Sequence, residues 1–348
     1  MTTGTAAPPG GRAGGVGTAA QMVGVLGTGS YLPDRTVDNH EMADTIGVTL
    51  EWIERKTKIR ERRYASAHQA TSDLAVAAAH GALADAGLTA DDIDYLIVST
   101  STGDSPQPPT AYLVQSALRA WRAACFDVNV VCSGFVYGIA LAQGMLALRP
   151  DAIAVVIAAE VYSRFIDFSD RRTAVLLGDG AGAAVLGAVP APSGIVAVDL
   201  RSRGDLSRLI RVDAGGSRLP ASHATVDEGG HYFRMEGRDV AHFVRTAVPD
   251  SIQEILKGAD LEPADVDHFV PHQANGVLLD AVAELSPLPR ARMHRTVDRY
   301  GNTGSASVPV TLDEANRNGA IRAGQLVLIA SFGGGMSMGN CLLRWGRA

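Results

Sequence analysis

Short runs of apolar residues alternate along the chain with longer segments of helical pattern. In the first half, three such runs are apolar on both faces: Tyr95–Thr100, Cys125–Val131 and Ile153–Ala159. Strands that bury both faces and alternate with helices are typical of a mainly parallel sheet covered by helices on both sides. The hydrophobic pattern therefore predicts an α/β protein.

Two helices are predicted from their sequence signals. The polar residues Thr71–Asp73 can cap a helix that runs through about Ala86, with Gly87 as its terminator. Val240–Lys257 also has a helical pattern, but it contains Pro249. Because proline removes a backbone donor and collides with the preceding turn, we expect this helix to break there.

The second half of the chain repeats the rhythm of the first. Its predicted strands are Ile195–Leu200, Val266–Val270 and Gln325–Ala330. Each half ends in a glycine-rich turn that leads into an apolar strand, Gly178–Leu186 in the first and Gly333–Leu343 in the second. A duplicated α/β unit is the simplest explanation. It predicts an N-terminal half over residues 21–190 that carries the nucleophile discussed below, and a C-terminal half over residues 191–348.

Two segments fall outside this pattern. Residues 1–20 are rich in glycine, proline and other small residues and lack the apolar stretch of a signal peptide, so we expect a disordered tail. Residues 202–231 form a long, polar, glycine-rich stretch. Loops of that length are usually functional or mobile.

Composition and charge narrow the class of protein. The 348 residues are enough for about two compact units with a substantial core. A hydrophobic content of 46%, a charged content of 20% and a mean hydropathy of +0.08 are those of a globular protein. The net charge of −6 argues against a nucleic-acid-binding face. Three cysteines cannot form a disulfide framework, so a cytoplasmic location is expected.

The sequence gives no signal for a membrane span, a metal or a redox cofactor. The most apolar helical candidate, residues 130–148, is interrupted by small and polar residues and is shorter than the roughly 20 residues of a span. Neither Cys-x-x-Cys nor His-Glu-x-x-His occurs in the sequence. The glycine-rich segment Gly178–Leu186 leads into a strand, whereas a dinucleotide fingerprint lies between a strand and a helix.

Cys132 is the strongest candidate nucleophile. It follows an apolar strand and opens a segment that is apolar around nearly its whole circumference, which predicts a buried central helix. A thiol at a helix N-terminus lies at the positive end of the helix dipole, and this favours the thiolate. A free cysteine is more often a small buried hydrophobe. We prefer that interpretation for Cys125 and Cys341, which lie within strands.

Partners for this thiol lie at the ends of predicted strands. His272 follows the strand Val266–Val270, whereas His268 lies within it and is expected to be packed. Asn302 lies in a turn of small residues, where it could otherwise cap a helix. The glycines after Phe332 leave backbone N–H groups free to approach a substrate. A cysteine, a histidine, an asparagine and bare backbone amides at sheet ends together indicate an acyl-transfer site.

These segments resemble the β-ketoacyl-acyl-carrier-protein synthase III family of the thiolase superfamily. The resemblance runs from about Val23 to the C-terminus. Its motifs are VLGTGSYLPDRTVDN, EWIERKTKIRERRYA, DVNVVCSGFVYG, GDGAGAAVL, VPHQAN, YGNTGSASVP and SFGGGMSMG. The resemblance implies a thiolase-like fold, in which two duplicated α/β halves form a five-layer αβαβα sandwich, and it implies a homodimer.

The resemblance also implies roles for individual residues. Cys132 would be the nucleophile that becomes acylated. His272 and Asn302 would hold the developing enolate oxygen while a malonyl thioester loses CO2. The N–H groups of Cys132 and Gly334 would form the oxyanion hole for acyl transfer. Preorganised donors of this kind can lower such barriers by several kcal/mol.

The implied substrates are an acyl-CoA and a malonyl thioester, the latter expected on an acyl carrier protein. Trp52 and Arg171 match the pair that sandwiches the adenine of coenzyme A, and Lys56 and Asn275 are further expected contacts of coenzyme A. Coenzyme A is then part of a substrate, and no cofactor is expected.

Several positions depart from the family pattern. Lys58 replaces a usual glycine, Val277 replaces a basic residue, and His242 replaces a lysine. The segment Ser105–Thr110 has prolines where an aromatic residue commonly shapes the acyl pocket. The candidate catalytic residues are kept while the docking face and pocket differ, which predicts a specialised pathway enzyme.

Three functions are compatible with these residues. The first is decarboxylative condensation of an acyl-CoA with a malonyl thioester, as in fatty-acid or polyketide biosynthesis. The second is a non-condensing acyltransferase that moves the acyl group to a hydroxyl, an amine or a carrier thiol. The third is a binding or scaffold protein without catalysis. Retention of Cys132, His272 and Asn302 favours the first.

Overall fold

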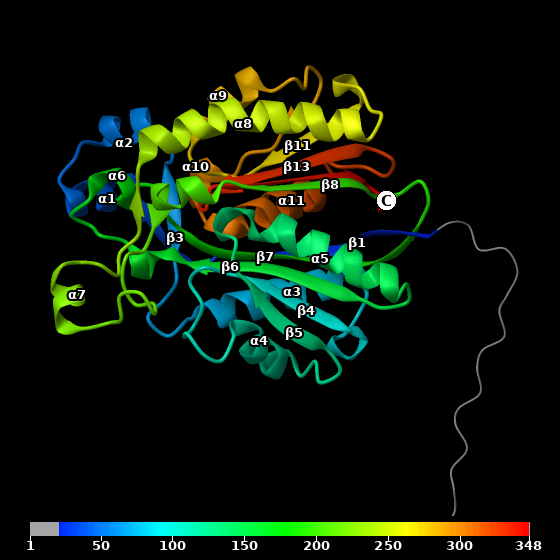
Figure 1. Cartoon of the computed structure of the whole chain (residues 1–348), viewed down its shortest axis with the longest axis horizontal. Helices are drawn as coiled ribbons and strands as arrows, with labels where there is room; N and C mark the ends of the chain where they lie inside the picture. The colour runs from blue at the N-terminus through cyan, green and yellow to red at the C-terminus, as the bar shows by residue number, and fades with distance from the viewer. Residues whose placement is uncertain (1–20, 348) are drawn as a thin grey trace, which may run out of the picture.

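Two five-stranded sheets lie one above the other, with helices between them and on both outer faces (Figure 1). The computed structural model describes residues 21–347, so the tail predicted at residues 1–20 lies outside the described part of the chain.

The first sheet is built entirely from the first half of the chain. In spatial order its strands are β1 (Gln21–Tyr31), β7 (Asp179–Pro190), β6 (Ala154–Val161), β4 (Tyr95–Ser99) and β5 (Ala124–Val128). The pairs β6–β4 and β4–β5 are parallel, whereas β1–β7 and β7–β6 are antiparallel. Strand β5 is therefore one edge of this sheet.

The second sheet repeats this arrangement with the second half of the chain. Its order is β8 (Gly194–Ser202), β14 (Ser337–Arg344), β13 (Leu326–Gly333), β11 (His268–Pro271) and β12 (Arg292–Met293). The pairs β13–β11 and β11–β12 are parallel, whereas β8–β14 and β14–β13 are antiparallel. The same order and the same directions in both halves are what a duplicated unit produces.

The prediction of mainly parallel sheets was wrong for the final strand of each half. Strands β13 and β14 are joined by a turn of only three residues, Gly334–Met336. A connection that short can form a hairpin, but a parallel crossover needs a dozen residues or more. In the second half the glycine-rich segment therefore reverses the chain, whereas in the first half it lies within β7, and the longer connection of residues 162–178 makes the reversal from β6.

The helices complete five layers. Helices α3 (Thr71–Ala86) and α4 (Thr110–Leu118) cover the outer face of the first sheet. Helices α8 (Gly237–Gly258) and α9 (Gly276–Leu285) cover the outer face of the second sheet. Between the sheets lie α5 (Gly134–Leu148) and α11 (Ser307–Arg317) (Figure 1).

Apolar cores lie between the layers, one on the outer face of each sheet and one between the two sheets. The central one joins α5 and α11 to both sheets and includes Phe135, Val308 and the fully buried Trp345. The predicted helix through Ala86 is α3, and Gly87 ends it in the left-handed conformation with φ 67°. The predicted thiolase-like sandwich of two α/β halves is confirmed.

Two helix predictions need correction. Helix α8 is continuous over 22 residues and passes through Pro249 without ending, because its apolar face stays packed on the second sheet. Helix α5 buries only one face, and Leu141 and Leu148 are exposed on the other. The segment Val131–Leu148 is long and apolar enough to cross a membrane by length and composition alone, with 50% of it buried as the central helix of the fold.

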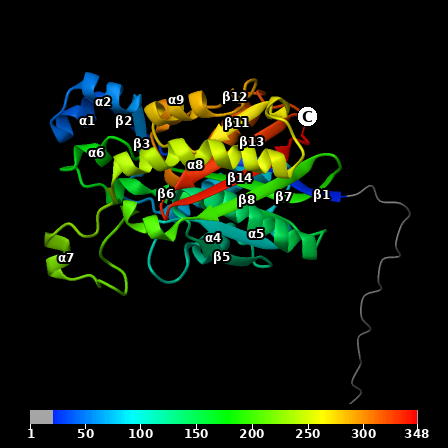
Figure 2. The ribbon, with the colours of Figure 1, turned by 45° about the horizontal axis from the view of Figure 1, so that its top comes forward.

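Shorter elements lie together at one end of the sandwich (Figure 1). They are β2 (Arg35–Asp38), α1 (Asn39–Ile46), α2 (Leu50–Thr57), β3 (Glu61–Tyr64), α6 (Arg171–Ala174), β9 (Ile210–Arg211), β10 (Arg234–Met235) and α10 (Val297–Tyr300). The long polar stretch between β8 and α8 carries α7 (His223–Asp227), which projects from the body of the molecule (Figure 2).

Candidate active site

The candidate nucleophile lies in a tight turn between β5 and α5. Cys132 sits in a 3-10 turn, Val131–Ser133, and is 7% exposed. Val131 before it has φ 46°, a left-handed conformation that is costly for a β-branched residue. On the other side, a Cβ on Gly333 would lie 2.5 Å from the Cβ of Cys132 and 2.8 Å from its Sγ. Only a bare backbone fits against this thiol.

The thiol is protonated at rest. Burial, with a smaller contribution from the charge of Glu160, raises the pKa of Cys132 to about 12. Hydrogen bonds from the backbone of Gly334 and of Cys132 itself lower that pKa but do not outweigh the loss of solvation. Backbone N–H groups at the helix N-terminus therefore favour the thiolate as expected, but burial outweighs their effect on the pKa.

His272 is held as a neutral ring. It follows β11, is 2% exposed, and burial lowers its pKa to about 3. Its Nδ1 lies 2.7 Å from the Oγ of Ser307, and that oxygen accepts a hydrogen bond from the N–H of Gln273 at 3.2 Å. The Ser307 hydroxyl then donates to Nδ1, which leaves the hydrogen on Nε2. The imidazole therefore presents a neutral N–H donor.

Asn302 is fixed in both backbone and side chain. Its N–H donates to the carbonyl of Leu176 at 2.8 Å, and its carbonyl accepts from the N–H of Gly178 at 3.0 Å. Its Oδ1 accepts from the N–H of Gly304 at 2.9 Å, so the Nδ2 group is the free end of the amide. The two halves of the chain meet here, through a single parallel bridge between Leu177 and Asn302.

One small cavity brings these residues together. Cys132, His272, Asn302 and Gly333 all line a space of about 40 Å³. The rest of its wall is mostly apolar: Tyr162, Leu177, Ile210, Phe233, Met235, Val240, Val244, Ala274, Leu278 and Phe332. A dry pocket of this kind strengthens hydrogen bonds to a developing oxyanion. The three candidate catalytic residues therefore face one space. Cys132 and Asn302 are about 170 positions apart along the chain.

A wide groove leads to this cavity from the surface. Its volume is about 1150 Å³, and it shares five lining residues with the inner cavity: Met235, Val240, Ala274, Leu278 and Asn302. Five cations line it against two carboxylates: Lys56, Arg171, Arg172, Arg238 and Arg245, with Glu236 and Asp239. This excess of positive charge suits a ligand that carries phosphates.

All four residues predicted to contact coenzyme A line the groove. They are Trp52, Lys56, Arg171 and Asn275. The guanidinium carbon of Arg171 lies 5.6 Å from the centre of the Trp52 ring, so these two side chains stack on each other. An adenine could lie between them only after they move apart.

Comparison with known proteins identifies the relatives of this fold and site. Models of 3-oxoacyl-[acyl-carrier-protein (ACP)] synthase III match residues 126–204, and models of the C-terminal part of that enzyme match residues 256–345. Acetoacetyl CoA synthase NphT7 of Streptomyces sp. (strain CL190) is 50% identical over 323 residues, which are 92% of this chain and 98% of that protein. The chain belongs to the 3-oxoacyl-[acyl-carrier-protein] synthase III family.

Other family members agree over nearly the whole chain. The β-ketoacyl-[acyl-carrier-protein] synthase III of Caldanaerobacter subterraneus subsp. tengcongensis is 42% identical over 93% of this chain and 98% of its own length. The crystal structure of the Aquifex aeolicus VF5 synthase III has a TM-score of 0.85 and 33% identity, covering 93% of this chain and 100% of that one. The priming β-ketosynthase of the R1128 polyketide pathway has a TM-score of 0.87 and 33% identity, covering 97% and 99%.

The backbone conformation of Lys58 explains why a glycine would suit this position. Lys58 ends α2 with φ 54°, in the left-handed region that glycine adopts more easily. Its ammonium forms an ion pair with Asp280 of α9, which also binds Arg295 at 2.6 Å. The extra positive charge is therefore paired. Val277 lines the groove, whereas His242 is exposed on α8 outside it.

Sequence reasoning missed two buried residues that support the site. Ser307 sets the orientation of His272, and nothing in the sequence connects the two. Glu160 is a fully buried carboxylate at the end of β6. It is the one charged residue in the otherwise apolar strand AVVIAAEV, a signal that could have drawn attention to it.

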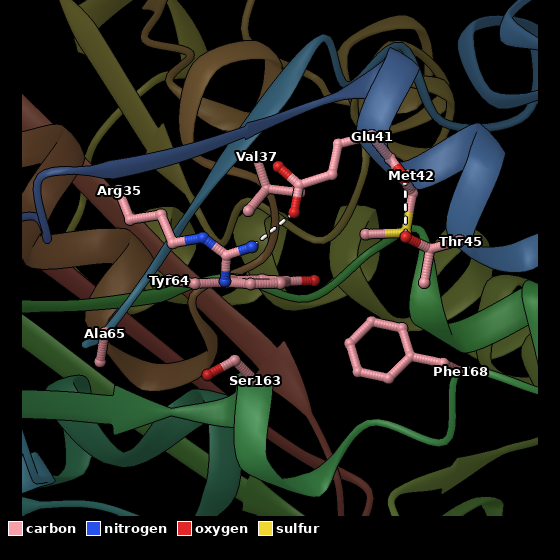
Figure 3. Close-up of a pocket in the computed structure, with 9 residues that line it drawn as sticks. All are labelled: Arg35, Val37, Glu41, Met42, Thr45, Tyr64, Ala65, Ser163 and Phe168. Carbon is pink, nitrogen blue, oxygen red and sulfur yellow. Dashed lines mark hydrogen bonds and ion pairs between the residues drawn. The ribbon is translucent and has the colours of Figure 1, made fainter. Parts of the chain in front are cut away.

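A separate cavity of about 300 Å³ lies between β2, α1 and β3 (Figure 3). Arg35 and Glu41 form an ion pair at this cavity, and the ring of Tyr64 lies below the guanidinium at 5.7 Å. Among its lining residues are none of those predicted for catalysis or for coenzyme A.

Proposed function

We propose that this protein transfers an acyl group from acyl-CoA to Cys132 and condenses it with a malonyl thioester, with loss of CO2. The convergence of Cys132, His272 and Asn302 on one cavity at the end of a cationic groove supports this function. Membership of the 3-oxoacyl-[acyl-carrier-protein] synthase III family agrees with it.

In the first half-reaction, the Sγ of Cys132 attacks the thioester carbonyl of acyl-CoA. A carbon–sulfur bond to Cys132 forms, the bond to coenzyme A breaks, and the thiol proton leaves with coenzyme A. The backbone N–H groups of Cys132 and Gly334 would hold the oxyanion; those groups already lower the pKa of the sulfur.

In the second half-reaction, the carbonyl oxygen of the malonyl thioester accepts hydrogen bonds from Nε2 of His272 and Nδ2 of Asn302. Loss of CO2 leaves an enolate whose charge these two donors stabilise. Neither donor is acidic enough to quench the carbanion, because His272 stays neutral. The carbanion attacks the acyl carbonyl, a carbon–carbon bond forms, and Cys132 leaves as a thiolate that takes up one proton.

The size of the cavity favours a short acyl group. A single water needs about 10–15 Å³ of such space. A cavity of about 40 Å³ therefore holds roughly three non-hydrogen atoms, the number in an acetyl group. The similarity to an acetoacetyl CoA synthase points the same way. We propose acetyl-CoA as the starter and an acetoacetyl thioester as the product.

We further propose malonyl-CoA as the preferred acceptor over malonyl carrier protein. Two positions expected to hold basic residues that dock a carrier protein hold Val277 and His242 instead, and Lys58 is paired with Asp280. The groove, by contrast, keeps Lys56, Arg238 and Arg245 for the phosphates of coenzyme A, besides Arg171 stacked on Trp52 and Arg172 paired with Asp170. Equal or faster product formation from malonyl carrier protein at matched concentration would contradict this preference.

We also propose a homodimer formed through the edge strand β5. This strand has no partner on its outer side within residues 21–347, and its residues are only half buried. Exposed apolar side chains flank it, namely Tyr112, Trp121 and Leu141. An open edge beside apolar surface is a template for pairing with a second copy.

The function is tested with purified protein, acetyl-CoA and malonyl-CoA. We expect an acetyl adduct on Cys132 by mass spectrometry, followed by release of CO2 and an acetoacetyl product. Cys132→Ala should lose all three, whereas Asn302→Ala should keep the adduct and lose condensation by roughly 100-fold or more. Absence of CO2 would refute condensation, and acyl transfer to an alcohol or amine that survives Asn302→Ala would favour the non-condensing alternative.

A further inference from the structure

A buried carboxylate forms a hydrogen bond with the turn that follows Asn302 and takes no part in the steps above. Glu160 is the second-last residue of β6 and is fully buried. We propose that Glu160 is a positioning residue, which holds the turn that carries Asn302 and the ring of Tyr162 in the places that condensation requires. The proposal rests on the condensing function. It adds a residue that positions Asn302 and Tyr162 for the second half-reaction.

Glu160 is held by hydroxyl and amide donors from two other segments. The hydroxyl of Thr102 donates to it at 2.7 Å, the hydroxyl of Ser305 at 2.8 Å, and the hydroxyl and N–H of Ser101 at 3.1 and 3.2 Å. Thr102 Oγ1 itself accepts from the N–H of Val161 at 2.9 Å, so its hydrogen is free for the carboxylate. The donor set is that of an ionised carboxylate, and Glu160 ties the end of β4 to the turn before α11.

The first tie leads to Asn302. Ser305 lies in the 3-10 turn Gly304–Ala306, and the N–H of Gly304 binds the Oδ1 of Asn302 at 2.9 Å. A Cβ on Gly304 would lie 3.1 Å from the Cγ of Glu160 and 2.4 Å from Cε2 of Tyr162. The turn therefore rests directly on both side chains. Any movement of Glu160 would be passed to the amide of Asn302.

The second tie leads to Tyr162. Its hydroxyl lies 2.7 Å from the Oγ of Ser101. Because Ser101 gives its own hydrogen to Glu160, Tyr162 donates to Ser101. The ring of Tyr162 lines the cavity and meets Phe233 edge-on at 5.8 Å. Glu160 thus fixes one wall of the space that receives the acyl group.

No cation is paired with Glu160 in residues 21–347, so dipoles alone balance its charge. Burial raises the pKa of Glu160 to about 7, against the effect of the four donors. The titratable groups that face it are Cys132 and Tyr162, and burial followed by the charge of Glu160 raises the pKa of each. The residues that follow β4 and the 304–306 turn contribute hydroxyl and backbone groups, and the residue opposite Glu160 on β7 is Gly180. The buried carboxylate of Asp179, opposite Val161, binds Ser163 and the N–H of Ala65 instead. Below about pH 7 the carboxyl becomes neutral and binds the hydroxyls less strongly.

The test compares loading with condensation in the same protein. Glu160→Gln keeps the volume but removes the charge and one acceptor oxygen. We expect acetylation of Cys132 at the wild-type rate or faster, because a negative charge beside the thiol is lost. Condensation should fall by roughly 10- to 100-fold, as expected for a misplaced catalytic group. In wild type the ratio of condensation to loading should decline below about pH 7, and in the variant it should be flat.

Two further variants test the contacts of Glu160 with Ser305 and with Ser101 separately. Ser305→Ala should lower condensation and leave loading unchanged, and Ser101→Ala should raise the use of propionyl-CoA relative to acetyl-CoA. Asp313→Asn is the matched control. Asp313 is an equally buried carboxylate that binds the hydroxyls of Thr28 and Ser30 at 2.7 and 2.6 Å, outside the cavity. It should lower the melting temperature without changing the ratio.

Three results would overturn the role of Glu160. They are an unchanged ratio in Glu160→Gln, an equal loss of loading and condensation, or a pH dependence that persists in the variant. If Glu160→Gln does not fold, an unchanged ratio in Ser305→Ala would overturn the role in its place. Wild-type protein that makes no condensation product would instead overturn the proposed function.

Discussion

The hydrogen bond between Ser307 and His272 decides which face of the ring can donate. Ser307→Ala removes the donor to Nδ1, so the ring can place its hydrogen on either nitrogen. We expect condensation to fall by about tenfold, a loss typical of a removed hydrogen bond in a catalytic site, with acetylation of Cys132 little changed. Rates of both half-reactions measure this.

Ser251→Ala controls for the loss of a buried hydroxyl. Ser251 is 1% exposed and its hydroxyl donates to the carbonyl of Val248, within α8. Both half-reactions should proceed normally in this variant. If Ser307→Ala slows loading and condensation alike, the bond holds the turn as a whole and does not select the tautomer of His272.

Gly333 and Gly144 form a second pair of predictions. A methyl group on Gly333 would sit 2.5 Å from the Cβ of Cys132, closer than real Cβ atoms approach, so the thiol or the end of β13 must move. Gly333→Ala should abolish acetylation of Cys132. Gly144 is exposed in α5 with nothing within 4 Å of an added Cβ. Gly144→Ala should raise the free energy of unfolding by about 0.5–1 kcal/mol and leave acetylation intact.

At the scale of single residues, the sequence predicted which residues meet in the site but not their protonation states or their supporting hydrogen bonds. Cys132, His272 and Asn302 each lie at the end of a strand or in a small-residue turn, and such positions can be recognised locally. The protonation of the thiol could not, because the burial that raises its pKa comes from segments far away in the chain. For the same reason Ser307, 35 residues after His272, left no local signal.

Among the elements, the edge strand β5 carries the prediction on assembly. Tyr112→Glu with Trp121→Glu places two charges beside that edge, where the wild-type side chains are 52% and 66% exposed. Burying unpaired charges in an interface is unfavourable, so we expect the dimer to dissociate at least tenfold more readily. Sedimentation at several concentrations measures this.

Val196→Glu provides the comparison. Val196 is an apolar residue that is 37% exposed on the edge strand β8 of the other sheet. Its substitution should leave the assembly unchanged. A wild-type protein that sediments as a monomer, or a dimer that only Val196→Glu disrupts, would refute pairing through β5.

Elements with strong local signals were predicted well. Helix α3 ends at the left-handed Gly87 as predicted, but it begins slightly earlier than the predicted caps Thr71–Asp73: its N-cap is Ala70, whose N–H is bound by Asp73 in the first turn. The uninterrupted course of α8 through Pro249 was not predictable, since packing on the second sheet stabilises the helix against its local defect. The direction of β14 depended on the length of a three-residue turn.

For the molecule as a whole, two buried histidines set the response to acid. Burial lowers the pKa of His272 to about 3 and that of His294 to about 4. Between pH 6.5 and about 4 the unfolded chain therefore binds protons that the native protein does not, and the free energy of unfolding falls as the pH falls. Glu160, with its pKa raised to about 7, acts in the opposite direction over pH 7 to 4.5.

As the pH falls, His272 and His294 together lower the free energy of unfolding by more than Glu160 raises it. Wild type should therefore be less stable at pH 5.5 than at pH 7.5. Urea unfolding at both pH values measures the change. His294→Gln should reduce the loss by up to about 1.4 kcal/mol per pH unit. His40→Gln, at an exposed position, should leave it unchanged. A wild-type stability that rises from pH 7.5 to 5.5 would contradict these assignments.

The duplication was visible in the repeated rhythm of strands and glycine-rich turns, and the family resemblance supplied the five layers. What neither pattern could supply is that the two units touch through Leu177 and Asn302 at the catalytic turn. That contact is made between segments more than 120 residues apart, on the order of 400 Å of extended chain.

This contact between the two halves has a consequence for how the protein is made. The thiol of Cys132 leaves the ribosome long before His272, Asn302 and Gly334 have been translated. At roughly 5–20 residues per second, the last of these follows about 10–40 seconds later. A nascent chain therefore cannot consume acyl-CoA, and the reaction starts only when synthesis is all but complete.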